Sequence, residues 1–174
     1  ELAAFKAEFA KLKKMYETKK LPMVVEDNWA FTSDWTQTEW NDWVGCWVRI
    51  KLDCAFYEEP TVMIVTDYKT GKPNDYKIVA YMEQLELYGL AALLMSAVED
   101  VTVIPRLMFI DTGTVYPPPD KLVKYTRADT PRLMAAWNAR VKPMMTDKQF
   151  KPTPSANACK WCFFSASKNG PCKY

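Results

Sequence analysis

Two neighbouring segments with different hydrophobic patterns, residues 44–56 and 61–69, constrain the fold of this chain more than any other feature. The first alternates between apolar and polar positions, which is the pattern of a half-buried strand. The second is apolar on both faces until Asp67, as expected for a strand in the middle of a sheet. Only the turn Glu58-Glu59-Pro60 separates them. We therefore predict a β-hairpin whose second strand is central.

The rest of the chain carries alternating helical and extended patterns. Apolar residues three and four positions apart predict helices over residues 1–17, over residues 75–98, and from a cap at Asp129 or Thr130 to about residue 145. Strand patterns occur at residues 23–31, 101–110, 114–116 and 122–126. This order predicts an α/β fold with a mixed central sheet flanked by helices. We expect residues 1–145 to form the core domain and residues 146–174 a C-terminal tail on it.

Composition restricts the chemistry that such a domain can perform. The 174 residues suffice for one ordinary domain, and the net charge of +2 decides nothing about a nucleic-acid partner. Histidine is absent, so a general base, nucleophile or metal ligand must be a carboxylate, Lys, Tyr or Cys. We find no continuous apolar run of the roughly 20 residues that a membrane helix needs, and no signal-peptide pattern. Five cysteines, an odd number, favour a reducing compartment, and we predict a cytoplasmic location. Because the chain starts at Glu1 without a Met, we expect a missing N-terminal segment.

The hairpin carries the residues with the clearest chemical potential. Asp67 and Lys69 are two apart on a strand, so they project from one face, and Asp53 lies near the end of the neighbouring strand. Two carboxylates supply the hard oxygen ligands that Mg²⁺ prefers, and an ammonium beside them can stabilise charge on a phosphate. This set indicates phosphodiester hydrolysis. The alternative is structural: Asp67 ends a buried strand, Lys69 is solvated, and Asp53 pairs with Arg49 or Lys51.

A longer run of residues resembles a known family. These are Gly45, Arg49 and Asp53 in GCWVRIKLD, residues 67–71 in DYKTG, and Gln84 and Tyr88 in QLELY. Together they resemble the RecB-like branch of the PD-(D/E)XK nuclease superfamily, whose core is that of restriction endonucleases, and they look especially like phage-encoded exonucleases and CRISPR-adaptation nucleases. The resemblance covers roughly residues 25–94 and the terminal cysteines.

The resemblance implies roles for individual residues. It makes Asp53 and Asp67 ligands of Mg²⁺ or Mn²⁺ and Lys69 the catalytic lysine. Gln84 and Tyr88, one helical turn apart, would both reach the active site or the DNA backbone. Glu26, on the preceding strand, matches an acidic residue that can assist metal binding. The family also tends to carry a His or Glu ligand on an N-terminal helix, a role left here to Glu1, Glu8 or a residue upstream.

The terminal cysteines form a second candidate site. Cys159 and Cys162 are separated by two residues and Cys172 follows, a spacing with which thiolates can hold one metal or cluster. Cys46 and Cys54 share the apolar face of the predicted strand, so we interpret them as core residues. RecB-like nucleases with a 4Fe-4S cluster carry one ligand near the N-terminus and three at the C-terminus. The resemblance therefore implies that Cys159, Cys162 and Cys172 bind such a cluster, with the fourth ligand upstream of this chain.

Basic and aromatic residues are available for contact with DNA. The Trp-rich segment 32–43 is expected to be a loop, and its Trp35, Trp40 and Trp43 are either stacking groups or core and lid packing. The basic positions are Lys11, Lys13, Lys14, Lys19, Lys20, Lys72, Lys77, Lys142, Lys148, Lys151 and Lys160. No recognition helix is evident, so contact would be to the backbone without base specificity.

The sequence predicts a metal-dependent deoxyribonuclease, an exonuclease of phage or bacterial recombination, repair or replication. An inactive DNA-binding or protein-interaction module of the same fold is the alternative, and a metal-dependent RNase is a third candidate.

Overall fold

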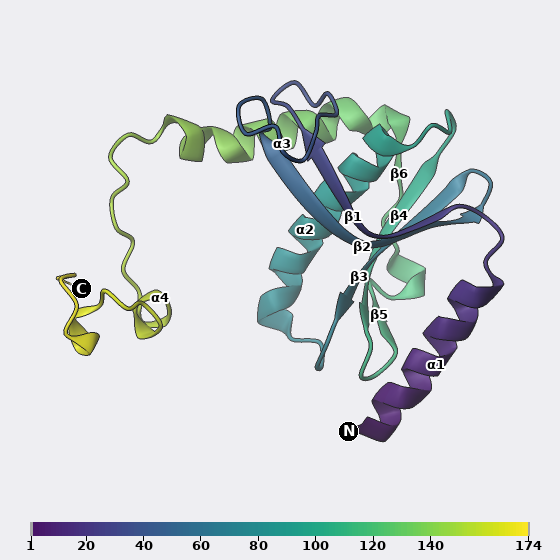
Figure 1. Ribbon diagram of the computed structural model, residues 1–174, viewed down its shortest axis with the longest axis horizontal. Coiled ribbons are helices and arrows are strands. Elements are labelled where there is room, and N and C mark those ends of the chain that lie inside the picture. The colour runs from purple at the N-terminus through teal and green to yellow at the C-terminus, as the bar shows by residue number, and fades with distance from the viewer. Residues whose placement is uncertain (1, 174) are drawn as a thin grey trace. The chain divides into compact units, whose positions relative to one another are not determined.

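The computed structural model describes residues 2–173, without the side chains of residues 2–5 and 75. These residues form two compact units, of which the first ends at Asn138 and the second starts at Ala139. The first unit contains the sheet, and the junction lies inside a helix, α3 (Thr130–Thr146) (Figure 1). The predicted division at residue 145 into a core domain and a tail stays a prediction.

The sheet has six strands and mixed direction. Its strands are β1 (Met23–Phe31), β2 (Val48–Glu59), β3 (Val62–Lys69), β4 (Thr102–Phe109), β5 (Thr114–Tyr116) and β6 (Tyr125–Thr126). The order is β1-β2-β3-β4-β5, with β6 paired to β4. All neighbours are antiparallel except β3 and β4, which run parallel. A parallel pair needs a crossover connection, and the helix α2 (Asp75–Met95) provides it. The predicted mixed α/β fold and the central position of β3 are confirmed.

Helices cover both faces of this sheet. α2 buries Leu90, Leu93 and their neighbours against Val65 and Val103 of the central strands, and Leu133 of α3 joins the same core. On the other face Met15 and Tyr16 of α1 (Leu2–Thr18) pack against Phe56 and Ile64. Successive side chains of a strand point to opposite faces of the sheet, so each central strand presents apolar residues to both layers of helices.

The boundaries differ from the predicted ones where local hydrogen bonding overrides the apolar pattern. The strand predicted at residues 44–56 begins only at Val48 and continues to Glu59. Val44 is fully exposed and Cys46 is half-buried in the preceding loop, so Cys46 is not part of the strand's apolar face. Cys54 is buried, as predicted. The helix predicted to reach residue 98 ends at Met95, and short elements follow α3: α4 (Ala156–Lys160) and the 3₁₀ turn Ala166–Lys168. Two further 3₁₀ turns are Pro119–Lys121 and Arg127–Asp129.

α2 is the most apolar helix of the chain. Its segment Tyr76–Met95 is long and apolar enough to cross a membrane by length and composition, although Glu83 and Glu86 interrupt it. In the fold, Leu85, Leu90 and Leu93 are buried in contact with the sheet. A helix that covers the centre of a sheet needs the same composition, so its burial in the core accounts for its hydropathy.

The packing of α2 gives a direct test of the fold. Leu93→Ala, at a position with no exposed surface, should lower the free energy of unfolding by about 2–5 kcal/mol because it leaves a cavity in the core. Val79→Ala on the exposed side of the same helix should change it by no more than about 0.5 kcal/mol. Urea unfolding followed by circular dichroism measures both, and equal effects would contradict this placement of α2.

Candidate active site

The predicted catalytic residues lie where β2 and β3 separate. The two strands pair from Glu59 and Val62 back to Cys54 and Thr66, and no further. Asp53 and Asp67 are the next residues on each strand. Beyond this point β2 stays paired with β1 and β3 with β4, so the strands diverge, with α2 lying across the region between them (Figure 1).

The Asp53 side chain replaces one of the backbone hydrogen bonds that β2 and β3 no longer make with each other. Its Oδ2 accepts a hydrogen bond of 2.8 Å from the backbone N–H of Tyr68, a donor that lies just past the last β2–β3 pair. Because this bond fixes the carboxylate against β3, Asp53 stays beside Asp67 although its own strand turns away.

Asp67 and Lys69 share the face that is directed toward α2. Tyr68 between them points to the other face, where its hydroxyl contacts that of Tyr16 and burial raises its pKa to about 12. Asp67 is 3% exposed. Lys69 Nζ lies 2.6 Å from Asp67 Oδ2, and no other donor reaches that oxygen among the residues the structure describes. The contact is an ion pair and a charge-assisted hydrogen bond, and both effects lower the pKa of Asp67 against the effect of burial.

The electrostatics show that Lys69 does not fully compensate the buried carboxylate. Burial raises the pKa of Asp67 and the neighbouring charge of Asp53 raises it further, while Lys69 acts in the opposite direction. The net shift is upward. The site thus contains a desolvated anion that additional positive charge would stabilise.

A cation–π contact positions Lys69, and a hydrogen bond fixes the turn that follows it. Its ammonium lies 4.7 Å from the centre of the Tyr81 ring, a cation–π contact from α2. The turn after β3 is fixed where Gly71, at a φ of 85° that favours glycine, donates its N–H to Asp111 Oδ2 at 2.7 Å. Sequence reasoning missed Tyr81 and Asp111. The spacing of Tyr81, Gln84 and Tyr88, three and four residues apart on one helix, was the available signal for the first.

Gln84 and Tyr88 connect α2 to the diverging half of β2. Gln84 Nε2 donates to the Tyr88 hydroxyl at 2.6 Å, and that hydroxyl donates to the backbone carbonyl of Lys51 at 3.2 Å. Tyr88 is buried, and its pKa is raised first by burial and also by the charges of Asp67 and Asp53. The pair therefore lies beside the two carboxylates, and its contacts hold the arm of β2 that carries Asp53.

The donor set fits a divalent cation such as Mg²⁺. Two carboxylates from adjacent strands, one of them almost fully buried, match an ion that accepts one or two protein carboxylates and keeps other positions for water and phosphate. Within residues 2–173 no three acidic or cysteine side chains gather closely enough to hold a metal by themselves. The set is thus two carboxylates and an ammonium.

The other acidic residues predicted as possible metal ligands are Glu26, Glu8 and Glu1. Glu26 lies between Val25 and Asp27, which pair with Cys54 and Leu52, but it has a φ of 53° and its carboxylate pairs with Lys51 at 3.3 Å. Glu8 pairs with Lys11 at 2.6 Å along α1. Glu1 lies outside the described residues. The metal-assisting role of Glu26 stays a prediction.

The terminal cysteines are all partly exposed and none forms a disulfide. Ser155 caps α4 through the N–H of Ala158, and the N–H of Cys162 bonds the carbonyl of Cys159, so these two cysteines lie on one short turn. Cys172 donates its N–H to the carbonyl of Phe164. The three do not converge as a metal-binding group in the described part of the chain, and the predicted cluster stays a prediction.

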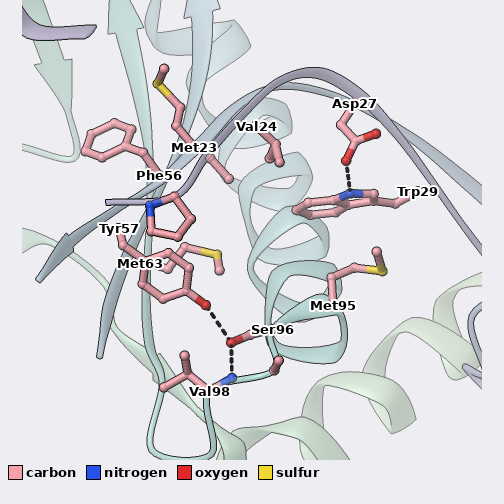
Figure 2. Close-up of a pocket in the computed structure, with 13 residues that line it drawn as sticks. Met23, Val24, Asp27, Trp29, Phe56, Tyr57, Met63, Met95, Ser96 and Val98 are labelled. Carbon is pink, nitrogen blue, oxygen red and sulfur yellow. Dashed lines mark hydrogen bonds between the residues drawn. The ribbon is translucent and has the colours of Figure 1, made fainter. Parts of the chain in front are cut away.

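A separate cavity of about 390 Å³ lies between the start of β1 and the end of α2. Figure 2 shows its mostly apolar walls, with Asp27 accepting from the Trp29 indole and Tyr57 bonded to Ser96. None of the candidate catalytic residues lines it. Its polar groups are engaged with one another, and it is distinct from the carboxylate site.

Comparison with known families agrees with this geometry. The family model of the PD-(D/E)XK nuclease superfamily matches residues 52–167, a span that includes Asp53, Asp67 and Lys69 and covers most of the chain. The chain therefore belongs to the PD-(D/E)XK nuclease superfamily. No curated protein matches the chain.

The raised pKa of Asp67 predicts that this residue destabilises the metal-free protein. Between pH 3.8 and the raised folded pKa, the carboxyl of the folded chain retains a proton that the unfolded chain has already released. The wild type should therefore lose stability as pH rises from about 4 through the folded pKa. Asp67→Asn lacks this titration, so its Tm in EDTA should exceed that of the wild type at pH 7 and approach it near pH 4. Each kcal/mol corresponds to about 2–4 °C.

Asp100→Asn, at an exposed turn, is the matched control and should leave Tm unchanged. Mg²⁺ should raise the Tm of the wild type and of Asp100→Asn but not of Asp67→Asn, because only a bound ion stabilises the folded state. A metal-free Asp67→Asn protein less stable than the wild type at pH 7 would contradict the assignment.

Proposed function

We propose that the protein is a Mg²⁺- or Mn²⁺-dependent nuclease that hydrolyses DNA phosphodiester bonds. The observation that carries the proposal is the meeting of the almost fully buried Asp67 carboxylate with Asp53 and Lys69 at the point where two strands separate. Membership of the nuclease superfamily supports hydrolysis of a nucleic acid. The choice of DNA rather than RNA rests on the resemblance of the DYKTG and QLELY motifs.

Each residue has a role that follows from its position. Asp53 and Asp67 would hold the divalent ion, which when bound stabilises charge on the phosphate and activates water. Lys69, whose ammonium contacts the Tyr81 ring, would orient the attacking water or neutralise the charge that develops on the phosphate. Gln84 and Tyr88 act through the strand: they hold the Lys51 carbonyl and so keep Asp53 in place.

The finer assignment extends this proposal. We propose an exonuclease of phage or bacterial recombination, repair or replication, acting in the cytoplasm on the DNA backbone without base specificity. Arg49, Lys51 and Lys72 lie on or next to the segments that carry the carboxylates, and they supply positive charge for phosphates. An inactive module of the same fold would bind DNA and cleave nothing.

Lys69→Ala is the sharpest test of catalysis. The variant should cut single-stranded or duplex DNA at least about 100-fold more slowly than the wild type, because a positioned charge at the reacting phosphate is lost. Its affinity for DNA should change little, since one lysine among many contributes to backbone binding. Digestion of single-stranded DNA, duplex DNA and RNA with Mg²⁺, Mn²⁺ or EDTA provides the measurement.

Lys124→Ala, an exposed lysine before β6, should retain full activity and serves as the control. A wild-type protein that binds DNA but leaves all three substrates intact with either metal would support the inactive module. Preferential cutting of RNA would replace the proposed substrate.

We propose further that Cys159, Cys162 and Cys172 ligate a structural 4Fe-4S cluster together with a fourth ligand upstream of residue 1. Protein that includes this upstream segment, prepared anaerobically, should contain about four iron and four sulfide per chain. Cys162→Ser should lose them, whereas Cys54→Ser should retain them because Cys54 is buried in the sheet. A longer protein that contains no iron would contradict the cluster proposal and leave the nuclease proposal unchanged.

A further inference from the structure

The C-terminal end of α1 is fixed against β2 on the face of the sheet opposite to α2. The Tyr16 ring meets the Phe56 ring edge-on, with 6.5 Å between the ring centres. Directly after the helix, the ammonium of Lys19 lies 4.5 Å from the centre of the same Phe56 ring and 3.2 Å from the Glu58 carboxylate. These contacts hold the helix end at one place on the sheet.

The Tyr16 hydroxyl lies at the point where β2 and β3 separate. It donates to Cys54 Sγ at 3.4 Å and contacts the Tyr68 hydroxyl. Cys54 belongs to the last pair of the β2–β3 ladder, whereas Tyr68 lies two residues past its partner Thr66. If Tyr68 donates to Tyr16 and Tyr16 donates to Cys54, one chain of hydrogen bonds runs from β3 to β2. Tyr16 therefore links the two strands through side chains where their backbone bonds stop.

The two residues that Tyr16 contacts are neighbours of the candidate metal ligands. Cys54 directly follows Asp53, and Tyr68 directly follows Asp67. Tyr68 is also the residue whose backbone N–H donates to Asp53 Oδ2. The main chain of Tyr68 is thus bonded to one carboxylate while its side chain is bonded to α1. A shift of this side chain would move the donor that fixes Asp53 beside Asp67.

The neighbouring polar contact on this face joins a different pair of strands. Arg106 of β4 donates from Nε to Thr66 Oγ1 at 3.1 Å, so it connects β4 to β3. Burial raises the pKa of the Cys54 thiol to about 11, so near pH 7 its contact with Tyr16 is a hydrogen bond between neutral groups. The side-chain link between β2 and β3 on the α1 face thus depends on the Tyr16 hydroxyl.

We propose that Tyr16 is a positioning residue for the metal site: its hydroxyl holds β2 and β3 at the separation that lets Asp53 and Asp67 bind one divalent ion. The proposal rests on the proposed nuclease function and adds α1 to the elements that form the site. Tyr16 acts through Cys54 and Tyr68, the two residues that its hydroxyl contacts. Removal of a group that orients metal ligands indirectly typically costs about 10- to 100-fold in metal affinity or activity.

Tyr16→Phe keeps the ring against Phe56 and removes only the hydroxyl. The variant should bind Mn²⁺ about 10- to 100-fold more weakly than the wild type, measured from the electron paramagnetic resonance signal of free Mn²⁺. In metal-free protein its Tyr68 amide should exchange with deuterated water at least about 10-fold faster, measured by NMR, because the bond to Asp53 opens more often. Cleavage of DNA should need a correspondingly higher Mg²⁺ concentration, while the KM for DNA at saturating Mg²⁺ should stay that of the wild type.

Tyr57→Phe is the matched control. It also removes one tyrosine hydroxyl from β2, the one bonded to Ser96 at 2.8 Å beside the separate cavity. It should lower Tm about as much as Tyr16→Phe, by about 2–4 °C, and leave Mn²⁺ affinity and Tyr68 exchange unchanged. Tyr68→Phe removes the same hydrogen bond from its other end, so it should weaken Mn²⁺ binding like Tyr16→Phe. The double variant should bind Mn²⁺ no more weakly than either single variant.

The proposal is wrong if Tyr16→Phe lowers Tm but leaves Mn²⁺ affinity and Tyr68 exchange at their wild-type values, since the tyrosine then only packs. Faster exchange with unchanged Mn²⁺ affinity also contradicts it, because the strand would then move without the carboxylates. A failure of the nuclease proposal has a different signature. The wild type would then neither bind Mn²⁺ nor cut nucleic acid, whereas faster Tyr68 exchange in Tyr16→Phe would still support the link between the strands.

Discussion

The separation of β2 and β3 after the pair Cys54 and Thr66 is the constraint on which the rest of the site depends. A continuing ladder would bond the backbone N–H of Tyr68 to β2, whereas here the Asp53 carboxylate accepts it. One hydrogen bond thereby satisfies a backbone donor and fixes an acidic side chain next to Asp67. The Tyr88 hydroxyl satisfies the Lys51 carbonyl on the other strand. Each group freed by the separation thus finds a partner that also shapes the site, as expected for buried backbone groups.

The same geometry explains why the site is electrostatically incomplete. Asp67 is almost fully buried, and its pKa is raised although Lys69 lies against it at 2.6 Å. A fold selected for stability alone would place an amide or an apolar residue there, because a buried charge without full hydrogen bonding is expensive. The residue is therefore better explained by a ligand than by packing. A divalent cation is the ligand whose charge and hardness match two carboxylates.

Much of this could be predicted from the sequence, for reasons that are visible in individual residues. The two-residue step from Asp67 to Lys69 and the four-residue step from Gln84 to Tyr88 are set by strand and helix periods, so their shared faces follow from the chain alone. The predicted start of β2 was wrong. Val44 and Cys46 continue the alternation by coincidence, whereas the turn between Asp42 and Gly45 keeps them outside the strand. Trp35 is buried and Trp43 is exposed. This difference depends on tertiary contacts, which neighbouring positions in a sequence do not encode.

The two strands continue differently beyond the point where they separate. The arm of β2 beyond the separation carries Lys51 and Arg49, whose guanidinium lies against the Trp43 ring, whereas the end of β3 carries Lys69 and turns at once through Gly71 into α2. Only β2 therefore stays extended beyond the carboxylates, paired with β1. Because that arm is held by the Tyr88 bond and the loop before β2 by Asp42, its position is fixed before any substrate arrives, and preorganised contacts of this kind reduce the entropy lost on binding. The bonds that hold this arm belong to the β-sheet and to α2, so the position of Asp53 beside Asp67 is set by the fold itself before any ligand binds.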